Sequence, residues 1–294
     1  MRAELRLALR AAMIAAPLTL GLAACGREAA GPDTAPLDQT EALLIGQEIA
    51  AEVQDIAGSF EPDGVLGPVF PALALHPLAS GLCVTFDPAD PDDADGDGVP
   101  TELTVTFDCS FSSREKTVEL TGTVLITDPS ATDFGFRFEF TELRHRVTYG
   151  EHVRLRQLDG VVQLVRSTTE LSIIDQTTTR QESSGRDPVV IAKDWDVHFI
   201  VDEGLSFDGW RRLPSGTLTI NGSMVRTRGE RSFALEVETV VGLHFDATCE
   251  ADQKFDGGQL LVTKTGGDRS GTVQIDFTGC GEEPVVTFLP PPGA

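Results

Sequence analysis

The sequence predicts an all-β protein, made mainly of antiparallel strands, with one short helix near the N-terminus. Apolar and polar residues alternate through most of the chain after about residue 100, with the period of two that half-buried strands require. A single stretch has helical periodicity, and turn residues separate the alternating runs. Strands with one buried face are typical of antiparallel sheets. We therefore expect about a dozen strands, arranged as a curved sheet, a sandwich or an open barrel.

The start of the chain has the features of an export signal. It consists of a basic segment and an uncharged run, formed by Arg2, Arg6, Arg10 and residues 11–24. The uncharged run is too short to cross a bilayer, and this order of segments is typical of a secretory signal. The sequence therefore predicts a signal peptide over residues 1–24.

The signal ends in the tetrapeptide Leu22-Ala23-Ala24-Cys25, which resembles the lipobox of bacterial lipoproteins. The resemblance implies that Cys25 becomes the first mature residue and carries the lipid that anchors the chain to a membrane. It also implies a place in the bacterial cell envelope, facing the periplasm or the cell surface. Gly26 favours the outer membrane, because many inner-membrane lipoproteins have Asp at that position. An ordinary signal peptide followed by an incidental cysteine is the alternative.

The chain is strongly acidic, with 46 Asp and Glu residues against 23 Lys and Arg residues. Cleavage after Ala24 would leave 45 of the acidic and 20 of the basic side chains, a net charge of -25. Such a charge argues against nucleic acid and anionic lipid as partners. The hydrophobic content of 40% is enough for a folded core.

The mature chain is expected to contain a tether, a helix and one large domain. Residues 25–37 are rich in Gly, Pro and Ala without periodicity, which predicts a flexible tether. Residues 59–294 form the β-rich domain. Within it, the proline-rich residues 62–80 are assigned no regular structure.

An amphipathic helix is predicted over residues 38–58. Asp38 occupies the N-cap position, Glu41 follows three residues later as in a capping box, and Gly58 suits the C-cap. One stripe of the helix is apolar and must pack on the β-rich domain. It comprises Ala42, Ile45, Ile49, Val53 and Ile56.

Two irregularities interrupt the strand pattern. After Phe140 the apolar phase shifts by one residue, to Leu143, which predicts a β-bulge. In addition, four glycines each lie just before an alternating run: Gly122, Gly160, Gly216 and Gly257. They would suit a repeated unit of an open, curved sheet, but we interpret them as ordinary turn glycines of hairpins.

Four cysteines remain besides Cys25, an even number that predicts disulfides in an exported chain. Three pairings exist. We expect the local one, Cys83 with Cys109 and Cys249 with Cys280, because short loops lose the least entropy on closure.

The sequence contains no recognisable catalytic motif. The five histidines are scattered, and neither HExxH nor GxSxG occurs. We therefore do not expect an enzyme or an organic cofactor. His198 and His244 lie on the polar phase of their strands, which favours solvated or cross-strand hydrogen-bonded side chains.

One basic cluster interrupts the acidic chain around a hairpin predicted at Gly150. It comprises Arg144, His145, Arg146, His152, Arg154 and Arg156. An anion site is one interpretation. We favour the other, in which these side chains form surface ion pairs of small net energy with carboxylates on neighbouring strands.

An acidic run around residues 87–102 carries the strongest site signal. Its centre resembles the DxDxDG calcium loops of thrombospondin type 3 and dockerin modules, because three alternating aspartates are followed by glycine. The resemblance implies five Ca²⁺ ligands: Asp93, Asp95, Asp97, the carbonyl of Val99, and Glu102. Thr104 replaces the bidentate Glu of an EF-hand, so we expect weak binding. The alternative is an acidic hairpin tip, between strands near 82–87 and 102–109, that keeps the sheet edge soluble.

These features predict a membrane-anchored lipoprotein whose β-rich domain binds a partner or has a structural role. A periplasmic carrier or chaperone for a hydrophobic ligand is the alternative. In a carrier, the helix would partly close an apolar cavity lined by the Phe-rich strand over residues 134–140. A hydrolase built from dispersed side chains has no positive support in the sequence.

Overall fold

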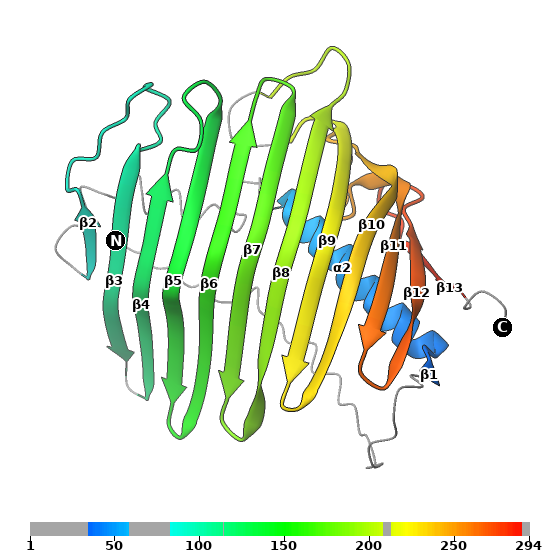
Figure 1. Cartoon of the computed structure of the whole chain (residues 1–294), viewed down its shortest axis with the longest axis horizontal. Helices are drawn as coiled ribbons and strands as arrows, with labels where there is room; N and C mark the ends of the chain where they lie inside the picture. Colours follow the sequence, from blue (N-terminus) through cyan, green and yellow to red (C-terminus); the bar gives the residue numbers. More distant parts are fainter. Residues whose placement is uncertain (1–34, 59–82, 114, 208–212, 290–294) are drawn as a thin grey trace. The chain divides into compact units, whose positions relative to one another are not determined.

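The computed structural model describes residues 35–58, 83–113, 115–207 and 213–289. The predicted signal peptide, Cys25 and the proline-rich residues 62–80 lie outside these ranges. The described residues form one 13-stranded sheet and one helix, α2 (Gln39–Gly58; Figure 1). The predicted all-β class is therefore confirmed, with a single open sheet as its form rather than a sandwich or a barrel.

The strands follow one another across the sheet almost in sequence order, β1-β12-β11-β10-β9-β8-β7-β6-β5-β4-β3-β2. From β2 to β12, neighbouring strands are antiparallel, as expected for a chain that turns back through short hairpins. The bounds are β1 Ala35–Pro36, β2 Val84–Asp87, β3 Glu102–Ser113, β4 Lys116–Thr127, β5 Phe134–Tyr149, β6 His152–Arg166, β7 Glu170–Ser183, β8 Arg186–Val201, β9 Gly216–Arg228, β10 Arg231–Phe245, β11 Phe255–Gly266, β12 Arg269–Asp276 and β13 Val285–Leu289.

Two short strands share the outer edge of β12. β13 pairs with it antiparallel, and β1 pairs with its first two residues in parallel. Leu37, directly after β1, is buried against the sheet. The prediction of a flexible tether is therefore wrong for residues 35–37, which pairing with β12 and burial of Leu37 hold on the sheet. Residues 25–34 lie outside the described residues.

Helix α2 begins as the sequence predicts. The Asp38 carboxylate accepts a hydrogen bond from the Glu41 amide at 2.8 Å, which satisfies one of the free N–H groups of the first turn. The Glu41 carboxylate instead pairs with Lys264 of β11, at 3.1 Å. The N-cap hydrogen bond thus lies within the first turn of the helix, whereas the carboxylate of Glu41 finds its partner on the sheet.

Ion pairs join α2 to one face of the sheet. Lys193 of β8 lies 2.6 Å from Glu52, and Arg226 of β9 lies 3.0 Å from Glu48. Lys264, only 5% exposed, adds the pair with Glu41. Cross-strand register places these three cations on the same face, which we call the helix face, and we call the opposite face the far face.

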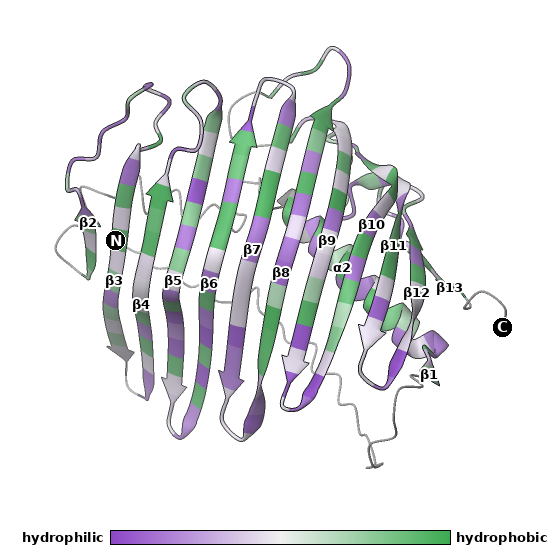
Figure 2. Ribbon diagram, in the orientation of Figure 1, coloured by the Kyte–Doolittle hydropathy of each residue, from purple (hydrophilic) through white to green (hydrophobic). Residues whose placement is uncertain are grey.

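The hydrophobic core lies on the helix face. It includes most of the apolar stripe of α2, with Ile49 and Val53 fully buried. The largest buried side chains of the sheet also belong to this core: Phe136, Phe138, Trp195, Phe199 and Phe255. Figure 2 shows that hydrophobic residues concentrate in the upper halves of β6 and β7, and hydrophilic residues in their lower halves.

Bulges interrupt several of the long strands. The predicted bulge after Phe140 is confirmed by a register shift between Phe140 and Leu143 in the pairing of β5 with β6. The interpretation of the glycines as turn residues was wrong for Gly122 and Gly160, which lie inside β4 and β6 with φ of 119° and 117°. A Cβ on Gly160 would lie 2.2 Å from the Gln176 carbonyl oxygen. These glycines therefore permit close backbone approach at bulges, a role that depends on the neighbouring strand.

Both expected disulfides are present in the structure. Cys83 joins Cys109, and Cys249 joins Cys280, with sequence separations of 26 and 31 residues. The first bridge lies beside the start of β2 and crosses to β3. The second joins the connection before β11 to the connection after β12 and so closes the segment that holds these two strands.

Candidate functional site

The acidic run lies in the connection between β2 and β3, at the upper end of the sheet (Figure 1). β2 and β3 pair antiparallel, so the predicted hairpin is confirmed. The connection closes through a hydrogen bond from the Thr101 amide to the Asp92 carbonyl, at 2.8 Å. The run of carboxylates is therefore held at the tip of a paired element.

Three aspartates of this loop converge. Asp93, Asp95 and Asp97 each offer a carboxylate oxygen, and these oxygens lie within 4.8 Å of one another. Backbone amides hold the side chains in place, because Asp93 accepts hydrogen bonds from both Gly96, at 2.8 Å, and Gly98, at 3.0 Å. The two glycines have φ of 80° and 91°, a conformation that other residues rarely adopt.

Asp97 is the most enclosed of the three carboxylates. Its Oδ1 accepts a hydrogen bond from the Val99 amide at 2.8 Å, whereas its Oδ2 is buried and has no hydrogen-bond partner. Burial raises the pKa of Asp97, and the negative charges of Asp95, Asp128 and Asp93 raise it further. A bound cation would neutralise this repulsion and satisfy the buried oxygen.

The other two predicted calcium ligands are placed differently. Glu102 begins β3, is exposed and pairs with Thr127, and it is not part of the group of converging carboxylates. Val99 is 1% exposed and belongs to the core. Asp128, which follows β4, is the additional carboxylate whose charge acts on the loop. Sequence analysis missed Asp128 because it lies on a different connection.

The predicted basic cluster divides between the two faces of the sheet. Arg144 and Arg146 lie on the far face. Arg146 forms the expected pair with a neighbouring strand, with Glu119 of β4 at 3.6 Å, whereas Arg144 pairs with Glu142 of its own strand at 3.0 Å. The remaining members point to the helix face: His145, His152, Arg154 and Arg156. No described carboxylate forms an ion pair with any of these four.

His244 of β10 links β11 and the connection after β8 at the upper end of the far face. Its Nδ1 lies 2.5 Å from Asp256, and its Nε2 lies 3.1 Å from Asp202. The hydrogen bond to Asp256 raises the pKa of His244, and Asp202 acts in the same direction. With a carboxylate at each ring nitrogen, the protonated imidazole is favoured. The expected cross-strand hydrogen bonding of this residue is therefore present, and the arrangement offers no nucleophile.

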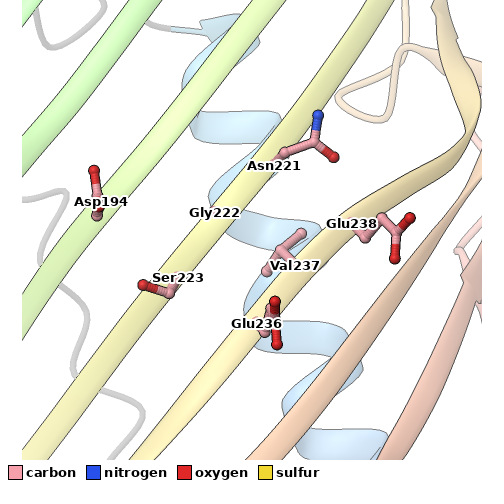
Figure 3. A pocket seen from close by; sticks show the side chains of 7 residues that line it. All are labelled: Asp194, Asn221, Gly222, Ser223, Glu236, Val237 and Glu238. Carbon is pink, nitrogen blue, oxygen red and sulfur yellow. The ribbon is translucent and has the colours of Figure 1, made fainter.

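A depression marks the far face where β8, β9 and β10 meet (Figure 3). Its side chains are mostly polar or acidic, and Figure 3 shows them in front of the strands, with α2 behind. The lining consists of Asp194, Asn221, Gly222, Ser223, Glu236, Val237 and Glu238. The depression lacks the apolar lining of an enclosed ligand cavity and holds no histidine, so it provides neither a carrier cavity nor an acid–base pair with a histidine.

Comparison with known proteins gives no relative. No family model, no curated protein and no solved structure matches the chain. Among the described residues, no helix is long and apolar enough to cross a membrane.

Proposed function

We propose that this protein is a lipid-anchored lipoprotein of the bacterial cell envelope, with a non-catalytic β domain that has a binding or structural role. The observation that carries the proposal is the tetrapeptide Leu22-Ala23-Ala24-Cys25 behind a basic and then uncharged segment. The two disulfides support it, because such bridges persist in oxidising compartments outside the cytosol.

The anchor predicts the location of the whole protein. In the native host, wild-type protein should be in the membrane fraction, and Cys25→Ala should release it or leave it unprocessed. Gly26→Ala is the matched control, because it changes the neighbouring residue and keeps the sulfur that would carry lipid. Fractionation and the mass of the N-terminal peptide measure both outcomes. A wild-type N-terminal peptide without lipid would refute the anchor.

We further propose that the loop of Asp93, Asp95 and Asp97 binds calcium and that the ion stabilises the β2–β3 hairpin. The buried, unpartnered Oδ2 of Asp97 supports this, together with the convergence of the three carboxylates. Oxygen ligands on a loop rich in glycine suit this cation. Without a bidentate Glu at Thr104, affinity falls in the range of extracellular modules, with a dissociation constant of about 0.1 to 1 mM.

Calcium should therefore raise the melting temperature modestly. At about 1 mM free calcium the expected stabilisation is roughly 0.4 to 1.4 kcal/mol, which corresponds to about 1 to 6 °C. Thermal melts in calcium and in chelator measure the shift, with magnesium as a control for simple screening. Asp95→Asn/Asp97→Asn should abolish it.

The matched control removes two exposed acidic charges elsewhere, as Asp187→Asn/Glu203→Gln, and should keep the calcium shift. If wild type shows no shift specific for calcium, the loop is an acidic hairpin tip. The same conclusion follows if Asp95→Asn/Asp97→Asn retains the shift.

A second candidate function is a carrier for a ligand with an apolar part. One observation favours it: apolar side chains continue on the helix face below the bulge at Gly160, where they remain partly exposed. They include Val118, Leu120, Leu143, Val147 and Leu158. An apolar surface of this kind is typical of interaction sites.

A further inference from the structure

Three cationic side chains and a histidine gather on the helix face at the lower ends of β4, β5 and β6 (Figure 1). Arg156 lies directly opposite His145 in the pairing of β5 with β6, and Arg154 lies two residues from Arg156 on the same face. Lys116, at the start of β4, acts on His145 through its charge. We call Lys116, His145, Arg154 and Arg156 the cationic patch.

The cationic patch has no acidic partner within the described chain. None of its side chains makes an ion pair or a side-chain hydrogen bond there, and all four are exposed. On β4 to β7, the helix face between the lower hairpins and the bulge at Gly160 carries no Asp or Glu. The three cations therefore lie together without a counterion among the described residues, although acidic residues outnumber basic residues by two to one in the chain.

The far face of the same strands shows the contrast. There Arg144 pairs with Glu142, and Arg146 pairs with Glu119 of β4. Among the described residues, carboxylates therefore pair with the arginines of the far face but not with those of the helix face. The surface ion pairs expected from the acidic composition are therefore found for the arginines of the far face only.

Like charges that lie close together on one face of a sheet repel one another. Partial burial lowers the pKa of His145, and the charges of Arg156 and Lys116 lower it further, so the neutral imidazole is favoured beside the three basic side chains. A bound anion would remove this repulsion and form charge-assisted hydrogen bonds with the guanidinium groups. The arrangement is therefore one that an anion would stabilise.

The neighbours of the cationic patch indicate what kind of anion fits. Val147 and Leu143 flank His145 on the same face, and Leu158 follows Arg156. All three are partly exposed, and the apolar helix face continues above them. We propose that the cationic patch binds the phosphate headgroup of an anionic phospholipid, whose acyl chains lie along this apolar surface. The inference rests on the proposed carrier role and not on the anchor at Cys25.

The acidic composition does not oppose this site. A net charge of -23 acts over the whole surface, whereas salt screens charges beyond about 8 Å at physiological ionic strength. The proposal therefore departs from the expectation that anionic lipid is not a partner, because that expectation rested on the net charge alone. A single headgroup bound by the patch lies close to the charges of Lys116, Arg154 and Arg156 and experiences mainly those charges.

The test measures binding of short-chain phosphatidylglycerol to the detergent-solubilised full chain by calorimetry. Phosphatidylcholine of the same chain length and inorganic phosphate are the comparison ligands. Arg154→Gln/Arg156→Gln should weaken phosphatidylglycerol binding at least about 10-fold, because it removes two guanidinium groups that donate charge-assisted hydrogen bonds to the headgroup. Arg144→Gln/Arg146→Gln removes the same charges from the far face of the neighbouring strand and should leave binding within about 2-fold of wild type.

Several results would overturn the proposal. Equal binding of phosphatidylcholine would exclude headgroup recognition, and equal binding of inorganic phosphate would exclude the apolar contribution. Competition by oligoglutamate at the affinity of the lipid would assign the patch to an acidic peptide instead. Equal weakening by the two double variants would mean that net charge, not the patch, controls binding. Thermal melts of both variants separate these results from unfolding, and the location of Cys25→Ala tests the anchor independently.

Discussion

Gly258→Ala is expected to lower the stability of the domain by about 3 kcal/mol, a decrease in melting temperature of roughly 6 to 12 °C. Gly258 lies inside β11 with φ of 116°, and a Cβ there would be 2.6 Å from the Gly242 carbonyl oxygen. The new methyl would also lie 2.6 Å from the Cα of Leu243. Because both contacts are with backbone of β10, relief requires the two strands to separate.

Gly257→Ala is the matched control on the adjacent residue. Its Cβ would meet no atom within 4 Å, and its φ is not in the positive range. We expect a change within about 0.5 kcal/mol. Denaturant and thermal unfolding of the two variants measure the difference. Equal stability of the Gly257→Ala and Gly258→Ala variants would contradict the close approach of the β10 and β11 backbones at this bulge.

Ile49→Ala is the second large effect and should destabilise the domain by about 3 kcal/mol. Ile49 is 0% exposed and lies on the face of α2 that packs into the core of the sheet. The truncation leaves a cavity between two rigid elements that cannot collapse fully around it. The expected cost is therefore the lost burial of the side chain plus the cost of the cavity.

Leu43→Ala provides the control on the same helix. Leu43 is 45% exposed, so removing its side chain changes little burial, and Ala is the better helix former. We expect a change below about 0.5 kcal/mol. Urea unfolding monitored by circular dichroism compares the variants. Equal destabilisation by Ile49→Ala and Leu43→Ala would contradict the docking of α2 on the helix face.

Local chemistry in the sequence was sufficient for several elements. The period of two predicted the strands because side chains in a strand alternate between faces. The shift of phase after Phe140 predicted the bulge, and Asp38 predicted the start of α2. The cysteine pairing followed from loop length. Each of these features depends on residues close together in the chain, so the sequence alone determines it.

The glycines were not predictable in the same way. A turn glycine and a bulge glycine have the same local sequence signal. Whether Gly160 turns the chain or lies beneath the backbone of β7 depends on the register of the neighbouring strand. Only the pairing of the strands distinguishes a turn glycine from a bulge glycine. The role of Gly160 therefore could not be predicted without the tertiary structure.

The candidate sites also combine features that the local sequence predicts with features that depend on other parts of the fold. Alternating aspartates in one loop predicted the convergence of Asp93, Asp95 and Asp97, but the influence of Asp128 comes from a separate connection. The basic cluster was visible in the sequence, whereas its division between paired and unpaired members was not. That division depends on which carboxylates the neighbouring strands place on each face.

The sequence by itself determined the strand class, the helix with its cap, the acidic loop, and the expectation of export and lipidation. The tertiary structure decided that the sheet remains open, that α2 packs on one face, and that Lys264 pairs with Glu41. It also decided that Arg154 and Arg156 form no ion pair with a described carboxylate, whereas Arg146 pairs with Glu119. Periodicity fixes where a side chain points relative to its own strand, but contacts between strands depend on register, and register is set by the whole sheet.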